Sequence, residues 1–392
     1  MPAHRRSAWL RRPLSLLALV MIATLSRATP PADIGALLDP ACTNSGVPGM
    51  VAVVLHGDQI VAQGAAGVRA AGSKLKITID DRFHLGSDTK AMTATLLAVL
   101  IEEGKLKWDT TIGEVFTGWV DNIDPAWKDV TLEQLLSHRA GAPANLDADG
   151  LWGRLWERKG TPAQQRLQLV RGVLKHPPVV PPGTTYLYSN AGYAMAGAMA
   201  EVITGRPWEE LLTEKVFQPL GITTGGFGAP GRPGLRDQPL GHDANGQPVT
   251  VGPKADNPPA IGPGATAHMA VGDWAKFVAL HLRGDPANPN RAAKLLKPES
   301  FVRLHLPKPG PGEPYAGGWL VTQRDWAKGS APHATGFVLD HAGSNTMWFC
   351  VTWLAPERDF AVLIACNRGG DIGAKACDQI AGSLIKQFNQ AP

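Results

Sequence analysis

Strand-like segments lie near both ends of the chain, and a long, mostly helical region separates them. Six segments have the short apolar pattern of strands: 49–55, 59–68, 318–323, 337–342, 347–354 and 360–365. The residues from about 108 to 311 instead show helical periodicity interrupted by long loops. This order predicts one mixed α/β domain closed by both ends of the chain, with an all-helical domain inserted in it.

Helical patterns at both ends of the chain are expected to flank the sheet, one at residues 34–38 and one from Asp371 to about Phe388. We expect Asp371 to cap the second helix. Residues 221–265 are rich in Gly and Pro and predict an irregular loop that can overhang a site. The predicted boundaries are a signal peptide at 1–28, the first part of the α/β domain at 29–104, an inserted all-α domain at 105–311 and the second part of the α/β domain at 312–392.

The first 28 residues have the pattern of a secretory signal peptide. Several arginines precede an apolar run from Leu14 to Leu25, which is too short for a comfortable membrane span. Ser26 and Ala28 then supply small residues at the two positions that matter most for cleavage. We therefore expect an exported protein, periplasmic or secreted, without a stable membrane anchor after cleavage; an uncleaved anchor is the alternative.

The charge balance after that cleavage argues against a nucleic-acid partner. The whole chain has 38 basic and 34 acidic residues, and five of the basic ones are arginines within 1–28, so 33 basic residues remain. These nearly cancel the acidic residues and leave no basic stripe. The expected partner is a small-molecule or peptide substrate, and the sequence leaves the oligomeric state open.

All four cysteines lie outside the predicted signal peptide. None belongs to a C-x-x-C pair, which argues against a zinc site. An exported protein can form disulfides, because the compartment is oxidising. The pairing that we predict is Cys42 with Cys377, while Cys350 and Cys366 are not expected to pair with each other.

Ser87 and Lys90 stand three positions apart, just before an apolar run that predicts a buried helix ending at Gly104. Residues three apart share a helix face, so Lys90 can reach Ser87. If Ser87 opens the helix, its backbone N–H has no acceptor within the helix and can stabilise an oxyanion, helped by the helix dipole. Burial and that dipole would move the pKa of Lys90 from about 10.4 towards roughly 7–8, the range of a general base.

The Ser-x-x-Lys motif alone is not specific, because it occurs at two other places in this chain. Ser73 precedes a strand-like run and has no helix start beside it. Ser383 lies deep in the last predicted helix, where its N–H is already bonded. Ser87 is therefore the candidate nucleophile; the alternative is a solvated serine that caps the helix, with an unrelated lysine nearby.

A second polar cluster, Tyr188-x-Asn190, precedes a predicted helix at 190–204. A tyrosine on the loop there can project its hydroxyl group towards a site. Asn190 offers both a donor and an acceptor. The alternative is a packed aromatic ring followed by an Asn that caps the helix.

A third cluster, His341-x-Gly343, stands at the end of a predicted strand. Gly343 would let another backbone or a ligand approach closely, and His341 can transfer protons or bind an anion. The alternative is an ordinary polar strand residue. The same spelling, His84-x-Gly86, occurs just before Ser87, so this motif gains meaning only from its context.

Together, in this order, the three motifs resemble those of the serine β-lactamase and penicillin-binding-protein superfamily, specifically its class C β-lactamase-like branch. That branch also includes D-Ala-D-Ala carboxypeptidases, D-aminopeptidases and esterases. Further segments resemble family segments from about Val47 to the C-terminus: 135–143 (LLSHRAGAP), 217–222 (FQPLGI) and 366–368 (CNR). The resemblance implies a β-lactamase-like α/β fold, with an antiparallel sheet flanked by terminal helices and an inserted all-α domain.

The resemblance also implies how the covalent chemistry proceeds. Ser87 would be the nucleophile, and Lys90 and Tyr188 would share its proton. The backbone N–H groups of Ser87 and Ser344 would form the oxyanion hole. Water, activated through Tyr188, would then hydrolyse the acyl-enzyme, and the reaction would need no metal or cofactor.

The same resemblance assigns the groups that hold the substrate. Asn190 would orient Lys90 and the substrate amide, while His341 and Gly343 would line the substrate site. Many family members have Lys-Thr-Gly where this chain has His341-x-Gly343. A histidine with a pKa near ~6.5 is only partly charged at neutral pH, so we expect weak or pH-dependent recognition of a substrate carboxylate, which argues against an efficient β-lactamase.

The function predicted from the sequence is therefore an exported serine hydrolase that acts through a Ser acyl-enzyme on an amide or ester, of the D-peptidase or esterase type. One alternative is a true class C-like β-lactamase. A second is a penicillin- or peptidoglycan-binding protein that is acylated but does not turn over.

Overall fold

The computed structural model describes residue 1 and residues 29–389 of the chain. The predicted signal peptide at 1–28 therefore lies, apart from its first residue, outside the described residues. Contacts join the chain from Pro31 onward into one unit, and the description below applies to that unit. The predicted domain boundaries within it stay a prediction.

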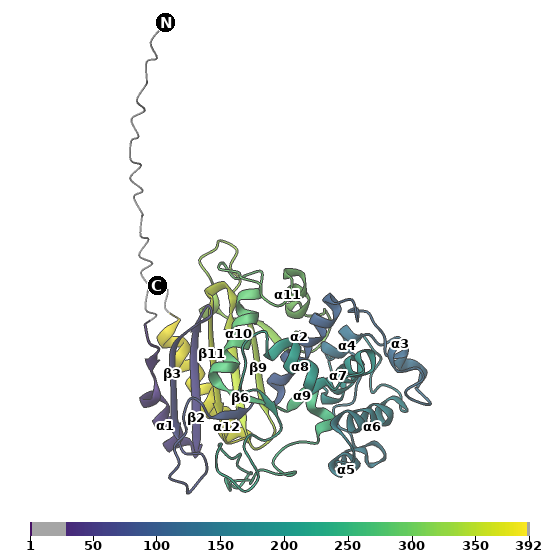
Figure 1. Cartoon of the computed structure of the whole chain (residues 1–392), viewed down its shortest axis with the longest axis horizontal. Helices are drawn as coiled ribbons and strands as arrows, with labels where there is room; N and C mark the ends of the chain where they lie inside the picture. The colour runs from purple at the N-terminus through teal and green to yellow at the C-terminus, as the bar shows by residue number, and fades with distance from the viewer. Residues whose placement is uncertain (2–28, 390–392) are drawn as a thin grey trace. The chain divides into compact units, whose positions relative to one another are not determined.

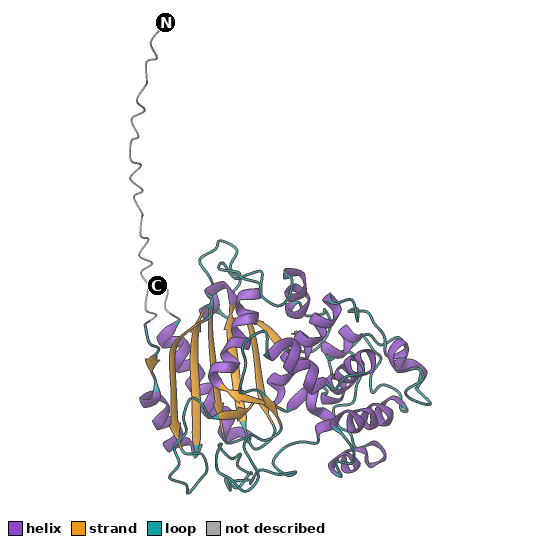
Figure 2. Ribbon diagram, in the orientation of Figure 1, coloured by secondary structure: helices purple, strands orange, loops and turns teal. Residues whose placement is uncertain are grey.

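Eight strands form one sheet in the order β1-β3-β2-β11-β10-β9-β8-β7. Figure 2 shows the strands in orange. Neighbouring strands are antiparallel, except that β1 and β3 are parallel. This mostly antiparallel sheet confirms the predicted mixed α/β fold class. The strands are β1 (Ala32–Asp33), β2 (Gly49–His56), β3 (Gln59–Gly67), β7 (Tyr315–Ala316), β8 (Trp319–Gln323), β9 (Phe337–Ser344), β10 (Phe349–Ala355) and β11 (Phe360–Cys366).

Strands from opposite ends of the sequence meet in the middle of this sheet. β2 pairs with β11, with Met50 opposite Cys366 and His56 opposite Phe360. Figure 1 shows the two strands side by side, one coloured for the beginning of the chain and the other for its end. The prediction that both ends of the chain close one domain is confirmed.

Each face of the sheet is apolar and is covered by helices. Along β2, Met50 and Val54 belong to the core under α1 and α12. Their neighbours Val51 and Val53 point to the opposite face and join the larger core with the remaining helices, as the two-residue period of a strand requires. The sheet is therefore a central layer with helices on both sides (Figure 1).

Helices dominate the region between β3 and β7. A small sheet in the order β4-β6-β5 interrupts them, and α10 packs on β2 and β11 of the large sheet. The short strands are β4 (Arg82–His84), β5 (Gly226–Phe227) and β6 (Ala267–Ala270). The helices are α1 (Gly35–Ser45), α2 (Thr89–Glu102), α3 (Ile112–Phe116), α4 (Leu132–Leu136), α5 (Leu151–Trp156), α6 (Pro162–Leu174), α7 (Asn190–Thr204), α8 (Trp208–Leu212), α9 (Gly262–Ala265), α10 (Val271–Gly284), α11 (Pro298–His305) and α12 (Gly370–Phe388).

Two predictions made from the sequence are wrong. The cap of α12 is Gly369, without a side-chain hydrogen bond, and Asp371 lies within the first turn, where its charge still favours the helix dipole. The pairing of Cys42 with Cys377 is absent, because all four cysteines are free.

Among the described residues, no helix combines the length and apolar character needed to cross a membrane.

Candidate active site

Ser87 lies in a single 3₁₀ turn, Gly86–Asp88, that joins β4 to α2. The N–H of Asp88 donates to the Leu85 carbonyl oxygen at 3.1 Å and closes this turn. The helix that follows is buried on nearly all sides, and the positive end of its dipole favours negative charge beside Ser87. The prediction that Ser87 stands at a helix entrance is confirmed.

Lys90 is fully buried in the first turn of α2. Its Nζ lies 3.0 Å from Ser87 Oγ, 2.7 Å from Asn190 Oδ1 and 2.7 Å from the Gly264 carbonyl oxygen. Burial lowers the pKa of Lys90 well below its usual value, and the nearby Asp88 acts in the opposite direction. A neutral amine has two N–H bonds and one lone pair; with the two donors on Asn190 and Gly264, the lone pair faces Ser87 and can accept its proton.

The carboxyl group of Asp88 shares this buried environment. Its Oδ2 accepts a hydrogen bond from Cys350 Sγ at 2.9 Å, while its Oδ1 is buried with no hydrogen-bond partner among the described residues. Burial raises the pKa of Asp88 well above its usual value. The opposite pKa shifts of Asp88 and Lys90 have the same cause, the cost of burying a charge.

Tyr188 lies beside both Ser87 and Lys90. The Lys90 Nζ is 4.6 Å from the centre of the Tyr188 ring. Burial raises the pKa of the Tyr188 phenol, and its contact with the Ser87 side chain acts in the opposite direction. The cap of α7 is Ser189 rather than Asn190, so the Asn190 side chain is available to Lys90.

His138 fixes the segment that carries Tyr188. Its Nδ1 accepts a hydrogen bond from the Ser189 N–H at 3.1 Å, and its carbonyl oxygen accepts one from the Leu187 N–H at 2.8 Å. The centres of the His138 and Tyr188 rings are 4.3 Å apart, and the ring planes are tilted by 41°. His138 has φ = 56°, which is uncommon for a residue other than glycine. Sequence reasoning did not name His138, although it lies in the family-like segment 135–143.

His341 on β9 is buried, and both of its ring nitrogens have partners. Nδ1 lies 2.8 Å from the Ala342 carbonyl oxygen and must carry the proton, while Nε2 accepts from the Tyr315 hydroxyl at 3.0 Å. Burial, reinforced by Lys90, lowers the pKa of His341 to about 3. The expectation that His341 titrates near pH 6.5 is therefore wrong, because the neighbours that bury it come from distant parts of the sequence.

Two glycines bring the end of β9 against the turn that holds Ser87. A methyl group on Gly86 would overlap the backbone nitrogen of Ser344. A methyl group on Gly343 would overlap the Leu85 carbonyl oxygen and lie 2.8 Å from Asp88 Oδ2. This close contact of two backbones places Ser344 next to the turn of Ser87, and it explains the glycine of the His341-x-Gly343 motif.

A cleft of about 420 Å³ opens beside these groups. Asn190 and Ser344 line it together with Asp147, Asn257 and Asn345. None of the described residues that line it is a lysine or arginine, and Asp147 supplies a negative charge. The cleft thus joins the predicted site residues to a polar pocket without a fixed positive charge.

The structure brings Ser87, Lys90, Tyr188 and Asn190 together, and it packs the strand of His341, Gly343 and Ser344 against them. Sequence reasoning missed Gly264, since a backbone carbonyl has no residue signature, and Tyr315, which covers His341. Among the described residues, no cluster of three or more His, Cys, Asp or Glu side chains is arranged to hold a metal ion.

Comparisons with known proteins identify the family of this chain. The model of the Beta-lactamase family matches residues 34–382. Penicillin-binding protein 4 of Amycolatopsis lactamdurans is 31% identical over 47% of this chain and 46% of the relative. A putative D-alanyl-D-alanine carboxypeptidase of Escherichia coli O157:H7 is 29% identical over 46% of this chain and 43% of the relative. The matched part of the chain thus spans less than half the length of these curated relatives.

A solved structure extends the likeness over most of the fold. The octameric penicillin-binding protein homologue from Pyrococcus abyssi superposes with a TM-score of 0.69 and 21% sequence identity. The match covers 89% of this chain and 76% of that one. At this identity the likeness concerns the fold.

Proposed function

We propose that this chain, which belongs to the beta-lactamase family, is a serine hydrolase that attacks an amide or ester carbonyl through Ser87. One observation carries the proposal: the Ser87 hydroxyl lies 3.0 Å from the amine of Lys90, and burial lowers the pKa of that amine. A neutral amine at hydrogen-bond distance is the arrangement that activates a serine.

In the acylation step, Lys90 accepts the Ser87 proton as Oγ forms a bond to the substrate carbonyl carbon. The carbonyl electrons move to its oxygen, which the N–H groups of Ser87 and Ser344 stabilise. When the tetrahedral intermediate collapses, the bond to the amine or alcohol breaks, and the leaving group takes the proton from Lys90 through the Tyr188 hydroxyl. The product is an ester of Ser87.

In the deacylation step, Tyr188 and Lys90 transfer protons in the reverse direction. A water molecule gives its proton through Tyr188 to Lys90 as its oxygen attacks the ester carbon. Collapse of the second intermediate breaks the bond to Ser87 Oγ, which takes the proton back and releases the acid. Asn190 keeps the Lys90 amine oriented in both steps through its 2.7 Å contact.

The charges around the cleft favour a substrate without a carboxylate next to the reacting carbonyl. The uncharged His341 has both ring nitrogens occupied, and Asp147 would repel an anion at the cleft. An ester, or the amide of a D-amino-acid peptide without a free carboxylate at that position, therefore fits better than a β-lactam. The relative named as a penicillin-binding protein keeps two other functions open to test, a class C-like β-lactamase and a penicillin-binding protein that does not turn over.

One set of assays separates these functions. We expect turnover of p-nitrophenyl acetate with a burst, little turnover of nitrocefin, and a fluorophosphonate adduct on Ser87 that is absent in Ser87→Ala. Efficient nitrocefin hydrolysis would favour the β-lactamase, and a stable acyl adduct without turnover would favour the binding protein. Unchanged labelling and turnover in folded Ser87→Ala would refute the role of Ser87.

We also propose export, on the pattern of residues 1–28 alone. The expected result is a protein recovered outside the cytoplasm whose N-terminus follows Ala28. Edman sequencing or intact mass of the recovered protein measures this, and an intact N-terminus in the cytoplasmic fraction would contradict it.

A further inference from the structure

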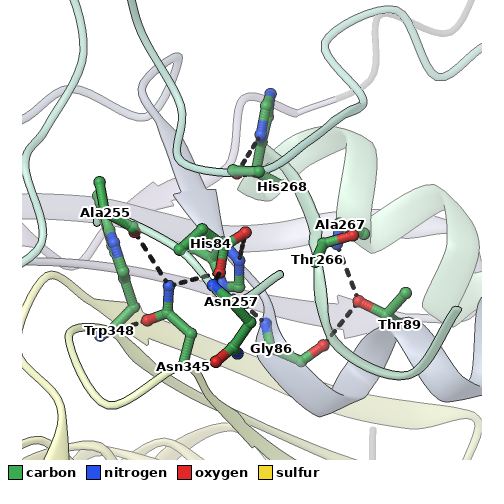
Figure 3. A network of polar contacts seen from close by, with 12 residues as sticks. His84, Gly86, Thr89, Ala255, Asn257, Thr266, Ala267, His268, Asn345 and Trp348 are labelled. Atoms are coloured by element: carbon green, nitrogen blue, oxygen red, sulfur yellow. Dashed lines mark hydrogen bonds and ion pairs between the residues drawn. The ribbon is translucent and has the colours of Figure 1, made fainter. Parts of the chain in front are cut away.

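Gly86 carries the peptide bond whose N–H belongs to Ser87. It has φ = 48°, a conformation that glycine adopts readily and can also leave readily, because no Cβ restrains it. Two buried side chains hold its two polar backbone groups (Figure 3). Its N–H donates to His84 Nδ1 at 3.0 Å, and its carbonyl oxygen accepts from Thr89 Oγ1 at 2.6 Å.

The bond from Thr89 determines where the Ser87 N–H points. The Gly86 carbonyl and the Ser87 N–H belong to one trans peptide plane, so they point in opposite directions. Thr89 is fully buried, and its hydroxyl oxygen also accepts a bond from the Ala267 N–H at 3.0 Å, which ties it to β6. With the carbonyl held inside, the N–H is turned outward.

His84 holds the N–H of Gly86, and Asp256 determines the tautomer and the orientation of the His84 ring. Because Nδ1 of His84 accepts from the Gly86 N–H, that nitrogen must be unprotonated, and the ring proton sits on Nε2. Nε2 lies 2.9 Å from Asp256 Oδ2. A carboxylate at this position fixes both the tautomer and the orientation of the ring, as carboxylates do for histidines that bind metals.

The same carboxylate also holds the segment of Ser344, whose N–H is the second donor of the proposed oxyanion hole. Asp256 Oδ1 accepts from Asn345 Nδ2 at 2.9 Å. Asn345 follows Ser344 directly, and its Oδ1 accepts from the N–H groups of Met347 and Trp348 at 3.2 Å each. Asp256 therefore joins the turn of Ser87 to the turn after β9.

Asp256 lies on the irregular loop that precedes α9, and Arg158 fastens this loop. Its Nη2 donates to the carbonyl oxygens of Pro253, Asp256 and Asn257 at 2.5, 2.5 and 3.0 Å. Asn257 in turn lines the cleft. The loop thus connects the wall of the cleft to the backbone beside the nucleophile.

We propose that Thr89, His84 and Asp256 are positioning residues that preset the oxyanion hole: they hold the Ser87 N–H and the segment of Ser344 in the orientation that stabilises the tetrahedral intermediate. The inference rests on the proposed function. None of these three side chains needs to touch the substrate; they act through the backbone groups of Gly86 and through the side chain of Asn345.

The test compares Thr89→Val with Thr89→Ser. Valine keeps the shape of threonine but loses both hydrogen bonds of Oγ1, whereas serine keeps the hydroxyl. We expect kcat for p-nitrophenyl acetate to fall about 10²-fold in Thr89→Val, with KM changed less than about threefold, and to recover to within about threefold of wild type in Thr89→Ser. The Ki of an arylboronic acid, which imitates the tetrahedral intermediate, should rise by the same factor as kcat/KM falls.

Thr95→Val is the matched control. Thr95 is equally buried in α2, and its hydroxyl bonds to Ala91 O at 2.8 Å and to His281 Nε2 at 2.9 Å, away from Ser87. If Thr89→Val retains its rate, falls no further than Thr95→Val, or is not rescued by serine, the proposal is overturned.

Asp256→Asn is the second variant, should Thr89→Val fail to fold. An amide offers one acceptor oxygen where the carboxylate has two, so either His84 or Asn345 loses its partner. We expect kcat to fall about tenfold or more in the folded variant, and an unchanged kcat would again overturn the proposal. Wild-type labelling by fluorophosphonate keeps the tests apart: an unlabelled, inactive wild type refutes the function, while an active wild type with a fully active Thr89→Val refutes the positioning alone.

Discussion

The close contact between β9 and the turn of Ser87 makes Gly343→Ala the sharpest test of the site. The added methyl group would overlap the Leu85 carbonyl oxygen and meet Asp88 Oδ2 at 2.8 Å. The Leu85 carbonyl is a backbone group just before the nucleophile, so it cannot move aside as a flexible side chain would. The end of β9, with Ser344, must instead move away from Ser87 by roughly 1 Å, and a misplacement of about 1 Å near a reacting centre can cost ~10² in rate.

Two separate effects are expected from this shift. Loss of one oxyanion donor lowers kcat by ~10²–10³, and forcing a methyl group into a packed contact costs about 1–3 kcal/mol of unfolding free energy. A domain with a stability of about 5–15 kcal/mol survives the second effect. The variant should therefore fold and still be nearly inactive.

The assay is kcat/KM for p-nitrophenyl acetate, with thermal unfolding followed by circular dichroism. Gly382→Ala is the matched control, because Gly382 lies in α12 and a methyl group there meets nothing within 4 Å. It should keep full activity and gain about 0.5–1 kcal/mol of stability. A folded Gly343→Ala with activity within about threefold of wild type would refute the reasoning about the contact.

Two further predictions concern stability. Burial lowers the pKa of His268 to about 4 and that of His341 to about 3. Below pH 6.5 the unfolded chain therefore binds protons at these histidines that the folded chain does not bind. The free energy of unfolding should fall as the pH falls from 6.5 to about 4, by roughly 2 kcal/mol per histidine at pH 5. Burial also raises the pKa of Asp340 to about 6, so protonation of this carboxyl group adds stability below pH 6 and offsets about one of the two histidine losses. The urea midpoint should therefore still be lower at pH 5 than at pH 7.5. A higher midpoint at pH 5 would contradict this prediction. Arg166→Met should cost about 3–5 kcal/mol of unfolding free energy, because the carboxylates of Glu201 and Glu209, which bond Arg166 at 2.9 and 3.0 Å, lose their buried partner. A triple variant that also carries Glu201→Gln and Glu209→Gln should recover part of the loss. A urea midpoint unchanged in Arg166→Met would contradict this prediction.

The sequence was most informative where a local pattern determines the structure. The apolar run after Lys90 predicted a buried helix, and α2 begins and ends where it indicated, with Gly104 just beyond its cap. The capping boxes at Thr131 and Thr161, which precede α4 and α6, are local patterns of the same kind. The order of the strands predicted that both ends of the chain would share one α/β domain, but not that β2 pairs with β11.

Side-chain environments could not be predicted in the same way, because they depend on residues far apart in the sequence. The pKa of His341 follows from its burial and from Lys90, and its Nε2 is occupied by Tyr315 on another strand. The position of Asp256 beside His84 joins residues 172 apart, and the irregular loop that carries Asp256 has no periodicity from which it could be read. Patterns predict elements, whereas the chemistry of a buried group depends on tertiary contacts.

The pairing of β2 with β11 also constrains the order of folding. The strand made early in synthesis has its hydrogen-bonding partner at residues 360–366, so the middle of the sheet cannot close while the ribosome is still adding those residues. Contacts of such long sequence separation form slowly, since a large loop must first be ordered. Until then the edge of β2 that pairs with β11 is open to other chains, and an unpaired strand edge of this kind favours aggregation during folding.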